Sequence, residues 1–436
     1  MHAAPRFLVP LLAALLLAAG AARAEEKLTG PWDAAPPLPK PEGRVVNVSN
    51  ANELQSAVAQ MQSGDTVVVA PGTYKLPTTI GIDGGKAGPK KNVTIRGATG
   101  KRDDVVIRGA GMGNNAITHG IYLGNAQDVV IADLSIGDVA NHPIMLNGPA
   151  GVTRVHIHNC RLFDAGEQFI KVSPSKPDGS GPGVDDCSVR YCVIEYTDRS
   201  KNWYTEGIDV HCGSGWVVSD NLFRNIRSPK SETKSTGGAI DFWNRSKDMV
   251  VERNTIINCE VGIRIGILDR KGYDDAAGGI VRNNFIWRAK DACFFPDVGI
   301  AVNDAAGTKV LHNTVILEDG YANAFESRFP TATGILFANN LTNKAIQKRD
   351  KSEARVEGNV TNASPDWFVN PATGDLHLGP KAGGLSKVST LPDAPEDFDG
   401  GKRPAGGTDP GGDDRSVGRP GAGKAGSVKP AAAKRK

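Results

Sequence analysis

The chain has 436 residues, with 51 lysine and arginine against 48 aspartate and glutamate residues, which gives a formal net charge of +3. Residues 402–436 carry more positive charge than this. The remainder is therefore close to neutral, which argues against a nucleic-acid-binding protein. Beyond an apolar run near the N-terminus, no segment approaches the length of a membrane span, so we expect no membrane-spanning helix.

Residues 1–24 have the pattern of a secretory signal peptide. Arg6 precedes an apolar run over residues 7–19, and Ala22-Arg23-Ala24 has the small-x-small form of a cleavage site. The apolar run is too short for a membrane anchor. We therefore expect an exported protein, secreted or periplasmic, in which residues 25–44 form a leader to the folded part.

The folded part begins with a strand pattern at residues 45–48, and Ser49 or Asn50 can cap a helix directly after it. Apolar residues then follow helical spacing at Leu54, Val58 and Met61. A strand and a turn follow over residues 66–74. One amphipathic helix ahead of many strands is expected to cover the open sheet edge at one end of a solenoid, which predicts an N-terminal helical cap.

From residue 92 onward the sequence repeats with a period near thirty residues. In each repeat, apolar residues lie five and three positions before, and two positions after, a shared position. That position is occupied by Asp133, Cys160, Cys192, Asn221, Asn254, Asn284, Asn313, Asn340 and Asn359. Asparagine tolerates the left-handed backbone of a sharp bend, and its amide can bond to the same residue one rung away. This period, with strands and no further helices, predicts an all-β solenoid with an asparagine ladder.

A second short strand pattern recurs once per repeat, with one outward residue between two inward apolar residues. Stacking these strands places the outward residues in one column: Tyr122, Met145, Lys171, Asp209, Asp241, Arg264, Ala301 and Glu326. A second outward column adds Asn147, Ser173, His211 and Trp243. A lysine, two aspartates and an arginine on consecutive rungs are the best functional lead in the sequence.

These repeats resemble those of right-handed parallel β-helix proteins of the pectate lyase-like superfamily. The architecture is shared by pectate lyases, chondroitinase-B-type and alginate lyases, polygalacturonases and pectin methylesterases. The resemblance covers residues 45–400, and the Gly/Pro/Lys-rich residues 401–436 are expected to be disordered. Stacked rungs would place Cys160 over Cys192, roughly 4.8 Å apart, as either a disulfide or two buried thiols.

Four long insertions border the strands that carry the charged column, at residues 174–185, 198–205, 227–237 and 266–278. Loops that surround one patch of a rigid scaffold usually form a binding cleft. Cleavage of a uronate polymer by β-elimination needs a base, a cation that stabilises the enolate-like intermediate, and an acid for the leaving oxygen. We therefore expect an acidic polysaccharide as the partner, no nucleic acid, and a monomeric protein.

Roles for individual side chains follow from this chemistry. Lys171 is the candidate base if its surroundings lower its pKa, and Arg264 can hold a substrate carboxylate through two hydrogen bonds. Trp203 and Trp243 are candidates for stacking on sugar rings, and Asn147 and Ser173 for binding the substrate. Oxygen ligands for Ca²⁺ are available from Glu167, Glu206, Asp209 and Asp241.

One strand carries a more specific resemblance. Glu167-Gln-Phe-Ile-Lys171-Val-Ser173 is similar to the strand of chondroitinase-B-type and alginate lyases in which a glutamate precedes a catalytic lysine. The next strand in that family has Arg-His-Gly, whereas this chain has Val210-His211-Cys212-Gly213. The histidine matches, and the nearest arginine of the outward column is Arg264. The resemblance thus implies a lyase centred on Lys171, His211 and Arg264.

Two other functions fit the same residues. Asp209 and Asp241, roughly 5 Å apart on adjacent rungs, could share a proton in a glycan hydrolase or esterase. Thr205-Glu206-Gly207-Ile208-Asp209 resembles a polygalacturonase motif, and the strand around Asp241 resembles that of pectin methylesterase. Alternatively, the charged column is a self-neutralising surface ladder on a non-catalytic carbohydrate-binding or envelope β-helix protein.

Overall fold

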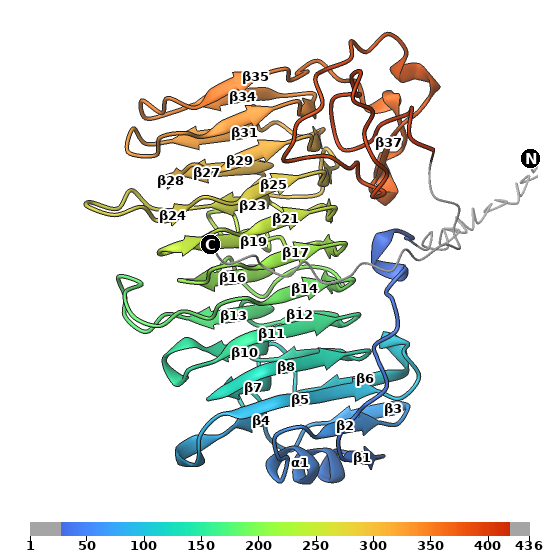
Figure 1. The fold of residues 1–436 in the computed structure, drawn as a ribbon, viewed down its shortest axis with the longest axis vertical. Helices are drawn as coiled ribbons and strands as arrows, with labels where there is room; N and C mark the ends of the chain where they lie inside the picture. The colour runs from blue at the N-terminus through green and yellow to red at the C-terminus, as the bar shows by residue number, and fades with distance from the viewer. Residues whose placement is uncertain (1–27, 419–436) are drawn as a thin grey trace, which may run out of the picture.

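The computed structural model describes residues 28–418, and most of the chain forms one stack of parallel coils (Figure 1). Three long sheets run along the stack, with 12, 10 and 10 strands, and every pairing within them is parallel. We call them sheets A, B and C, in the order in which each coil visits them. The predicted right-handed parallel β-helix is confirmed. Among the described residues, no helix is long and apolar enough to cross a membrane.

The strands are short, and successive coils add one strand to each sheet. Sheet A contains β1 (Val45–Val48), β2 (Thr66–Val69), β5 (Lys90–Gly97), β8 (Ala126–Ala132), β11 (Thr153–His158), β14 (Ser188–Arg190), β17 (Val217–Ser219), β21 (Val250–Glu252), β25 (Ile280–Arg282), β29 (Lys309–Leu311), β32 (Leu336–Ala338) and β35 (Arg355–Glu357). Sheet B contains β3 (Gly72–Lys75), β6 (Val105–Arg108), β9 (Ser135–Val139), β12 (Arg161–Ala165), β15 (Val193–Glu195), β18 (Leu222–Arg224), β22 (Thr255–Ile257), β26 (Phe285–Arg288), β30 (Thr314–Leu317) and β33 (Leu341–Thr342).

The candidate site lies on the third sheet. Sheet C contains β4 (Ile80–Asp83), β7 (His119–Gly124), β10 (His142–Asn147), β13 (Ile170–Ser173), β16 (Ile208–His211), β19 (Gly238–Trp243), β23 (Val261–Ile265), β27 (Ile300–Asn303), β31 (Asn323–Arg328) and β34 (Ala345–Lys348). Smaller elements are β20 (Ser246–Lys247), β24 (Ala276–Ala277), β28 (Ala305–Ala306), the antiparallel pair β36 (Phe368–Asn370) and β37 (Asp375–Leu378), and helix α1 (Ala51–Ala59). Short 3-10 turns cover Pro31–Asp33, Gly85–Ala87, Arg102–Asp104, Gly148–Ala150, Pro365–Trp367, Pro371–Thr373 and Pro380–Ala382.

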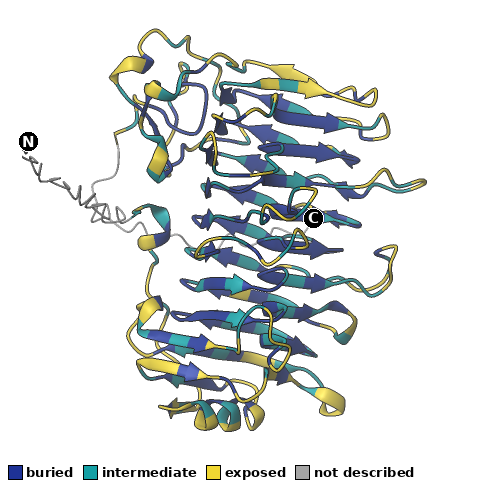
Figure 2. Ribbon diagram, turned by 180° about the vertical axis from the view of Figure 1, so that it is seen from behind, coloured by how far each residue is buried: buried dark blue, intermediate teal, exposed yellow. Residues whose placement is uncertain are grey.

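The inward residues of the three sheets form one continuous apolar core along the stack. In sheet C, Ile170 pairs with Ile208, which pairs with Ile240, and all three are fully buried. Figure 2 shows this as dark blue strands, with exposed residues concentrated in the loops between them. The predicted inward and outward columns of sheet C are confirmed in register. The charged column therefore points outward from a rigid surface.

The asparagine ladder is confirmed over six residues, from Asn221 to Asn359. Each side-chain Nδ2 donates to Oδ1 of the next asparagine at 2.8–3.0 Å. Two details of the prediction were wrong. Asp133 is not the ladder position of its coil, because strand pairing aligns Leu134 with Cys160. The left-handed residue of each bend is also the one before the asparagine, such as Arg253 with φ 52°.

All six cysteines, at positions 160, 187, 192, 212, 259 and 293, are buried free thiols within residues 28–418. Cys160 and Cys192 are stacked as predicted, and the backbone N–H of Cys160 donates to Sγ of Cys192 at 3.4 Å. Of the two expected arrangements of this pair, the structure has the two thiols.

Helix α1 lies at the N-terminal end of the stack in Figure 1. Its Leu54 and Val58 are buried in the main core, and Asn50 caps the helix by accepting a hydrogen bond from the backbone N–H of Glu53 at 2.9 Å. Residues 28–44 of the predicted leader lie along the stack, where Arg102 donates to the backbone oxygen of Trp32 at 2.6 Å. The predicted signal peptide, residues 1–24, lies outside the described residues.

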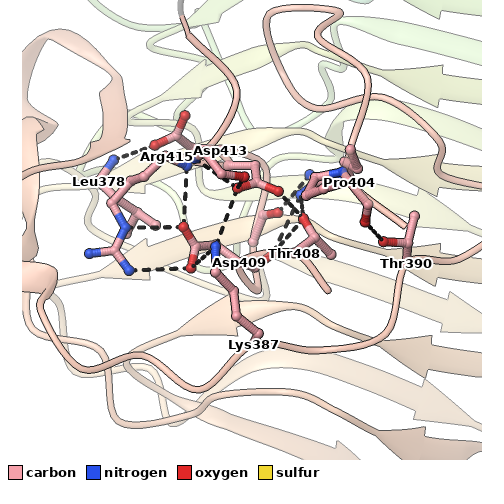
Figure 3. Close-up of polar contacts among 12 residues, drawn as sticks. Leu378, Lys387, Thr390, Pro404, Thr408, Asp409, Asp413 and Arg415 are labelled. Carbon is pink, nitrogen blue, oxygen red and sulfur yellow. Dashed lines mark hydrogen bonds and ion pairs between the residues drawn. The ribbon is translucent and has the colours of Figure 1, made fainter. Parts of the chain in front are cut away.

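The C-terminal boundary needs correction. The coils end at β35, and residues 361–400 pack beside sheet B, where Phe398 stacks on Phe285 at 3.8 Å between ring centroids. The prediction of disorder from residue 401 was wrong for residues 401–418, because polar contacts replace the apolar core that this segment lacks. Arg403 is buried and donates to Asn283 at 3.0 Å. In Figure 3, the carboxylate of Asp409 forms an ion pair with Lys387 and accepts a hydrogen bond from Arg415. Residues 419–436 lie outside the described residues.

Candidate functional site

The four charged residues of the outward column lie on adjacent strands β13, β16, β19 and β23. Lys171 pairs with Asp209, Asp209 with Asp241, and Asp241 with Arg264 in the register of sheet C. The rungs are roughly 4.8 Å apart, so Lys171 and Arg264 lie about 14 Å from each other. The predicted column is thus assembled from residues almost a hundred positions apart.

Lys171 forms an ion pair with Asp209, which is 3% exposed. Burial alone would lower the pKa of Lys171, but the charge and hydrogen bond of Asp209 outweigh burial and raise it above its ordinary value. Burial alone would also raise the pKa of Asp209, but His211 and Lys171 hold it well below its usual range. Lys171 is therefore a cation in the substrate-free protein. The lowered pKa that the base role of Lys171 required is absent here.

Asp241 and Arg264 form a second ion pair, with two hydrogen bonds between the guanidinium and the carboxylate. Asp241 is fully buried and also accepts the backbone N–H of Gly238 at 2.9 Å. The Asp241 carboxylate outweighs the effect of burial and raises the pKa of Arg264 above its ordinary value. The two aspartates, which the hydrolase interpretation pairs with each other, each face their own cation.

His211 lies between two side-chain donors. Its Nε2 is 3.2 Å from Nζ of Lys171, and its Nδ1 is 3.2 Å from Nδ2 of Asn244. Asn244 is oriented by Arg270, which donates to its Oδ1 at 3.2 Å. A neutral imidazole has one lone-pair nitrogen, so only one of the two donors can be satisfied at a time. The ring nitrogens are thus both placed to accept a hydrogen bond or a proton.

Trp243 positions the carboxylate of Asp209 instead of presenting a free stacking surface. Its Nε1–H donates to Oδ1 of Asp209 at 2.7 Å, and its ring packs against His211 with centroids 4.3 Å apart. Trp203 is partly exposed, but Lys234 lies over its ring at 3.3 Å from the centroid. One face of each indole is therefore occupied in the substrate-free protein.

The insertions border sheet C on two sides. Residues 198–205 and 227–237 lead from sheet B into sheet C, and they contact each other through Ser200 and Arg227 at 3.1 Å. Residues 174–185 and 266–278 leave sheet C on the other side, and both reach the turn after Trp243. There, Asn244 contacts the backbone oxygen of Pro177 at 3.3 Å. The charged column lies between these two pairs of loops.

The remaining predicted residues lie around the Lys171 rung. Asn147 pairs with Ser173 on the adjacent strand and donates to the hydroxyl of Tyr122 at 2.5 Å. Glu167 lies 3.6 Å from Nε2 of His142, and burial raises the pKa of its carboxyl. The structure therefore brings both residues close to Lys171 without joining them to its ion pair.

The predicted calcium ligands do not form a metal-binding group. Asp209 and Asp241 are each paired with a cation. Within residues 28–418, one group of side chains places three ligand atoms from His, Cys, Asp or Glu close enough together for one ion. It consists of His377, Asp399 and Asp413, beside sheet B. Calcium favours several converging oxygens, which Glu167, Glu206, Asp209 and Asp241 do not supply in this arrangement. No step of the chemistry below passes through a metal.

The sequence did not indicate Asn244, Arg270 or Gln168 as part of the site. Asn244 and Arg245 follow Trp243 with left-handed backbone at φ 54° and 78°, which is rare for successive non-glycine residues. Arg270 lies in an insertion, where no repeat pattern aligns it with another coil. These residues act through contacts between loops, and the periodic pattern carries no signal for such contacts.

No protein-family model matches the sequence, and no curated protein is similar to it. Solved structures do match. The pectate lyase Pel9A is 13% identical, with a TM-score of 0.53 over 85% of this chain and 96% of the lyase. An alginate lyase from Paenibacillus sp. str. FPU-7 is 18% identical, with a TM-score of 0.46 over 73% and 99% of the two chains. The Streptococcus pneumoniae surface protein and adhesin PfbA is 12% identical, with a TM-score of 0.45 over 71% and 93%.

These identities show the fold alone. The chain has the right-handed parallel β-helix fold, as the pectate lyase Pel9A does, and the resemblance inferred from the repeats is confirmed at this level. One such fold serves several chemistries, so the fold does not decide between catalysis and binding. The site residues must carry any statement about chemistry.

Proposed function

We propose that the protein binds an acidic polysaccharide on sheet C and cleaves it by β-elimination. The observation that carries this proposal is the column of two ion pairs, Lys171–Asp209 and Asp241–Arg264, on adjacent rungs of one outward face. Strongly perturbed ionisable groups on a rigid face between loops are typical of functional sites. Two cations about 14 Å apart match a polymer that carries one carboxylate on each sugar.

In this proposal, Lys171 holds the carboxylate of the sugar that reacts and stabilises the charge that develops on it. The raised pKa of Lys171 favours this role over that of base. His211 is then the base, because Nε2 lies beside Nζ of Lys171 and the ring has a lone pair to accept a proton. Arg264 holds a carboxylate of another sugar in the polymer.

The reaction balances without an oxidant or a cofactor. His211 removes the C5 proton next to the carboxylate, and the C5–H electron pair forms the C4–C5 double bond. The C4–O bond breaks, and its oxygen takes up one proton to become the hydroxyl of the departing chain. The product has an unsaturated uronate at its new non-reducing end, which absorbs ultraviolet light.

The test is an ultraviolet absorbance assay on alginate, polygalacturonate, chondroitin and dermatan with Lys171→Met, Lys171→Arg and His211→Gln. Arginine keeps the positive charge but cannot act as a base. We expect Lys171→Arg to retain part of the activity, and Lys171→Met and His211→Gln to lose roughly 10²–10⁴-fold in kcat. Lys348→Met is the matched control, because Lys348 is exposed on β34 at the end of the same sheet.

Two results would contradict this proposal. If Lys171→Arg is as inactive as Lys171→Met while His211→Gln is active, the base is Lys171. If wild-type protein gives no absorbance with any of the four polymers but still retains them on a column, the protein binds polysaccharide without cleaving it.

A second function is favoured by one observation. Glu206 has its pKa raised to about 8 by burial and by the charges of Asp209 and Asp241, whereas the pKa of Asp209 is held low. Two carboxyl groups with pKa values moved apart are the pattern of glycoside hydrolases. New reducing ends without absorbance in the assay above would support this function, with Glu206 and Asp209 in place of the predicted Asp209 and Asp241.

A further inference from the structure

A row of buried polar side chains borders the charged column at the start of the sheet C strands. The row contains His119, His142, Gln168 and Glu206 on successive rungs. His142 pairs with His119, and its Nδ1 contacts the backbone oxygen of Gln168 at 3.0 Å. The backbone oxygen of Glu206 accepts the N–H of Phe169 at 3.0 Å, which places Glu206 on the rung after Gln168.

This row has most of the unpaired buried polar atoms among the residues that the structure describes. Such atoms are His119 Nδ1, Gln168 Nε2, Gln168 Oε1, Glu206 Oε2, Ser219 Oγ and Asn303 Oδ1. Four of these six belong to the row. Burying a polar atom without a partner is costly, so a cluster of them calls for a functional explanation. Gln168 is fully buried, so its side chain does not reach the outward face. Glu206 is the member of the row that lies closest to the charged column.

The carboxyl of Glu206 fits tightly into the wall of the site. A Cβ at position 237 would overlap Cγ and Oε1 of Glu206, so Gly237 leaves the space that this side chain fills. Oε1 lies 4.0 Å from the guanidinium of Arg264, beyond hydrogen-bond distance. The unpaired Oε2 is itself buried, but the side chain as a whole is 15% exposed, so part of it reaches the outward face.

The charges that face Glu206 come from every strand around it. Asp209 follows it on β16, Asp241 lies on β19 and Arg264 on β23, while Lys171 lies on β13. Burial is the largest influence on its pKa, and the two aspartates act in the same direction against Arg264. The resulting pKa of about 8 means that Glu206 is protonated at neutral pH.

We propose that Glu206 is the catalytic acid, and that its carboxyl group gives its proton to the glycosidic oxygen of the bound polymer. This role rests on the proposed elimination and completes it. As the C4–O bond breaks, the O–H bond of Glu206 breaks and a new O–H bond forms on the departing sugar. Glu206 is left as a carboxylate beside Asp209 and Asp241, where like charge favours recovery of a proton from water.

The test uses Glu206→Gln and two kinds of substrate. Glutamine has the same shape and can donate a hydrogen bond, but it cannot give up a proton. The first substrate is the polymer that wild-type protein cleaves, and the second is a 4-deoxy-4-fluoro uronoside, whose fluoride leaves without a proton. Loss of fluoride from the second substrate also serves as the folding control, because an unfolded variant would release none.

We expect Glu206→Gln to lose about 10²–10⁴-fold in kcat on the polymer, and to release fluoride within a few fold of the wild-type rate. Wild-type kcat on the polymer should fall as the pH rises through about 8, where Glu206 loses its proton, and the variant should lack this fall. Glu353→Gln is the matched control, because Glu353 is an exposed glutamate ahead of β35, on the last coil and away from the charged column.

The outcomes separate the two proposals. Equal losses on both substrates, or no loss on the polymer, would overturn the role of Glu206 while the elimination itself stands. Wild-type protein that gives no unsaturated product from any polymer would overturn the elimination, and the acid role with it.

Discussion

Replacement of one ladder asparagine by cysteine should cost more in the middle of the ladder than at its beginning. Cysteine is the natural residue at two earlier positions of the same column, Cys160 and Cys192, so its size is compatible with the bend. The matched substitutions are Asn284→Cys in the middle and Asn221→Cys at the beginning. Both asparagines are fully buried, so solvent cannot replace the lost hydrogen bonds.

The difference follows from the side-chain hydrogen bonds at each position. Asn221 makes three, to the N–H of Cys192, the oxygen of Val189 and Oδ1 of Asn254. Asn284 makes four, because its Oδ1 accepts twice and the two N–H groups of its Nδ2 are shared among three acceptors. At about 1 kcal/mol for each bond, Asn284→Cys should cost about 4 kcal/mol and Asn221→Cys about 3 kcal/mol.

Urea unfolding followed by tryptophan fluorescence measures both costs, provided that the midpoint and the slope are compared separately. A solenoid can lose cooperativity between coils, and a changed slope would reveal this. The prediction is a free energy of unfolding about 1 kcal/mol lower for Asn284→Cys than for Asn221→Cys. Equal losses, or a larger loss for Asn221→Cys, would show that the ladder bonds do not contribute individually and would refute this reasoning.

Three further predictions concern the site, the thiols and the C-terminal segment. Asp209→Asn leaves Lys171 buried without a counterion, so the pKa of Lys171 should fall below its ordinary value. The free energy of unfolding of this variant should then rise with pH, unlike that of wild type. Urea unfolding at a series of pH values checks this. A thiol reagent should label none of the six buried cysteines in folded protein but all six in urea, and fewer than six in urea would indicate a disulfide. Arg403→Met should expose residues 404–418 to protease because several backbone oxygens lose their donor, whereas Lys402→Met, at an exposed position, should not.

The sequence predicted the fold because every level of the pattern agreed. Inward apolar residues, one asparagine per coil and outward charges all repeat with the same period, so an error in one would have misaligned the others. The agreement between patterns ends at the first coil of the ladder column, where Asp133 was wrongly assigned to the ladder position. Leu134 occupies that position, whereas later coils have cysteine or asparagine there. The C-terminal segment was misjudged for a different reason. Its few apolar residues suggested disorder, but Arg403 anchors it through polar contacts made with a ladder coil more than a hundred residues away.

The composition of the charged column was also predictable, whereas its protonation was not. Register alone placed Lys171 beside Asp209 and Asp241 beside Arg264, since each strand repeats one rung above the last. The pKa of each group depends instead on burial and on neighbours from several strands, and here these act in opposite directions. Lys171 gains a carboxylate within reach and stays charged, which removes it from the role of base.

Glu206 shows the opposite case. A glutamate ahead of an outward strand suggests an exposed carboxylate and hence a metal ligand. In the structure, the missing side chain of Gly237 lets this carboxyl sink into the wall, where two aspartates face it and the nearest guanidinium is 4.0 Å away. The glycine that permits this lies thirty-one residues from Glu206 in the sequence, on the next coil. A single absent Cβ therefore makes room for this carboxyl in the wall of the site, and only the stacking of two coils makes that visible.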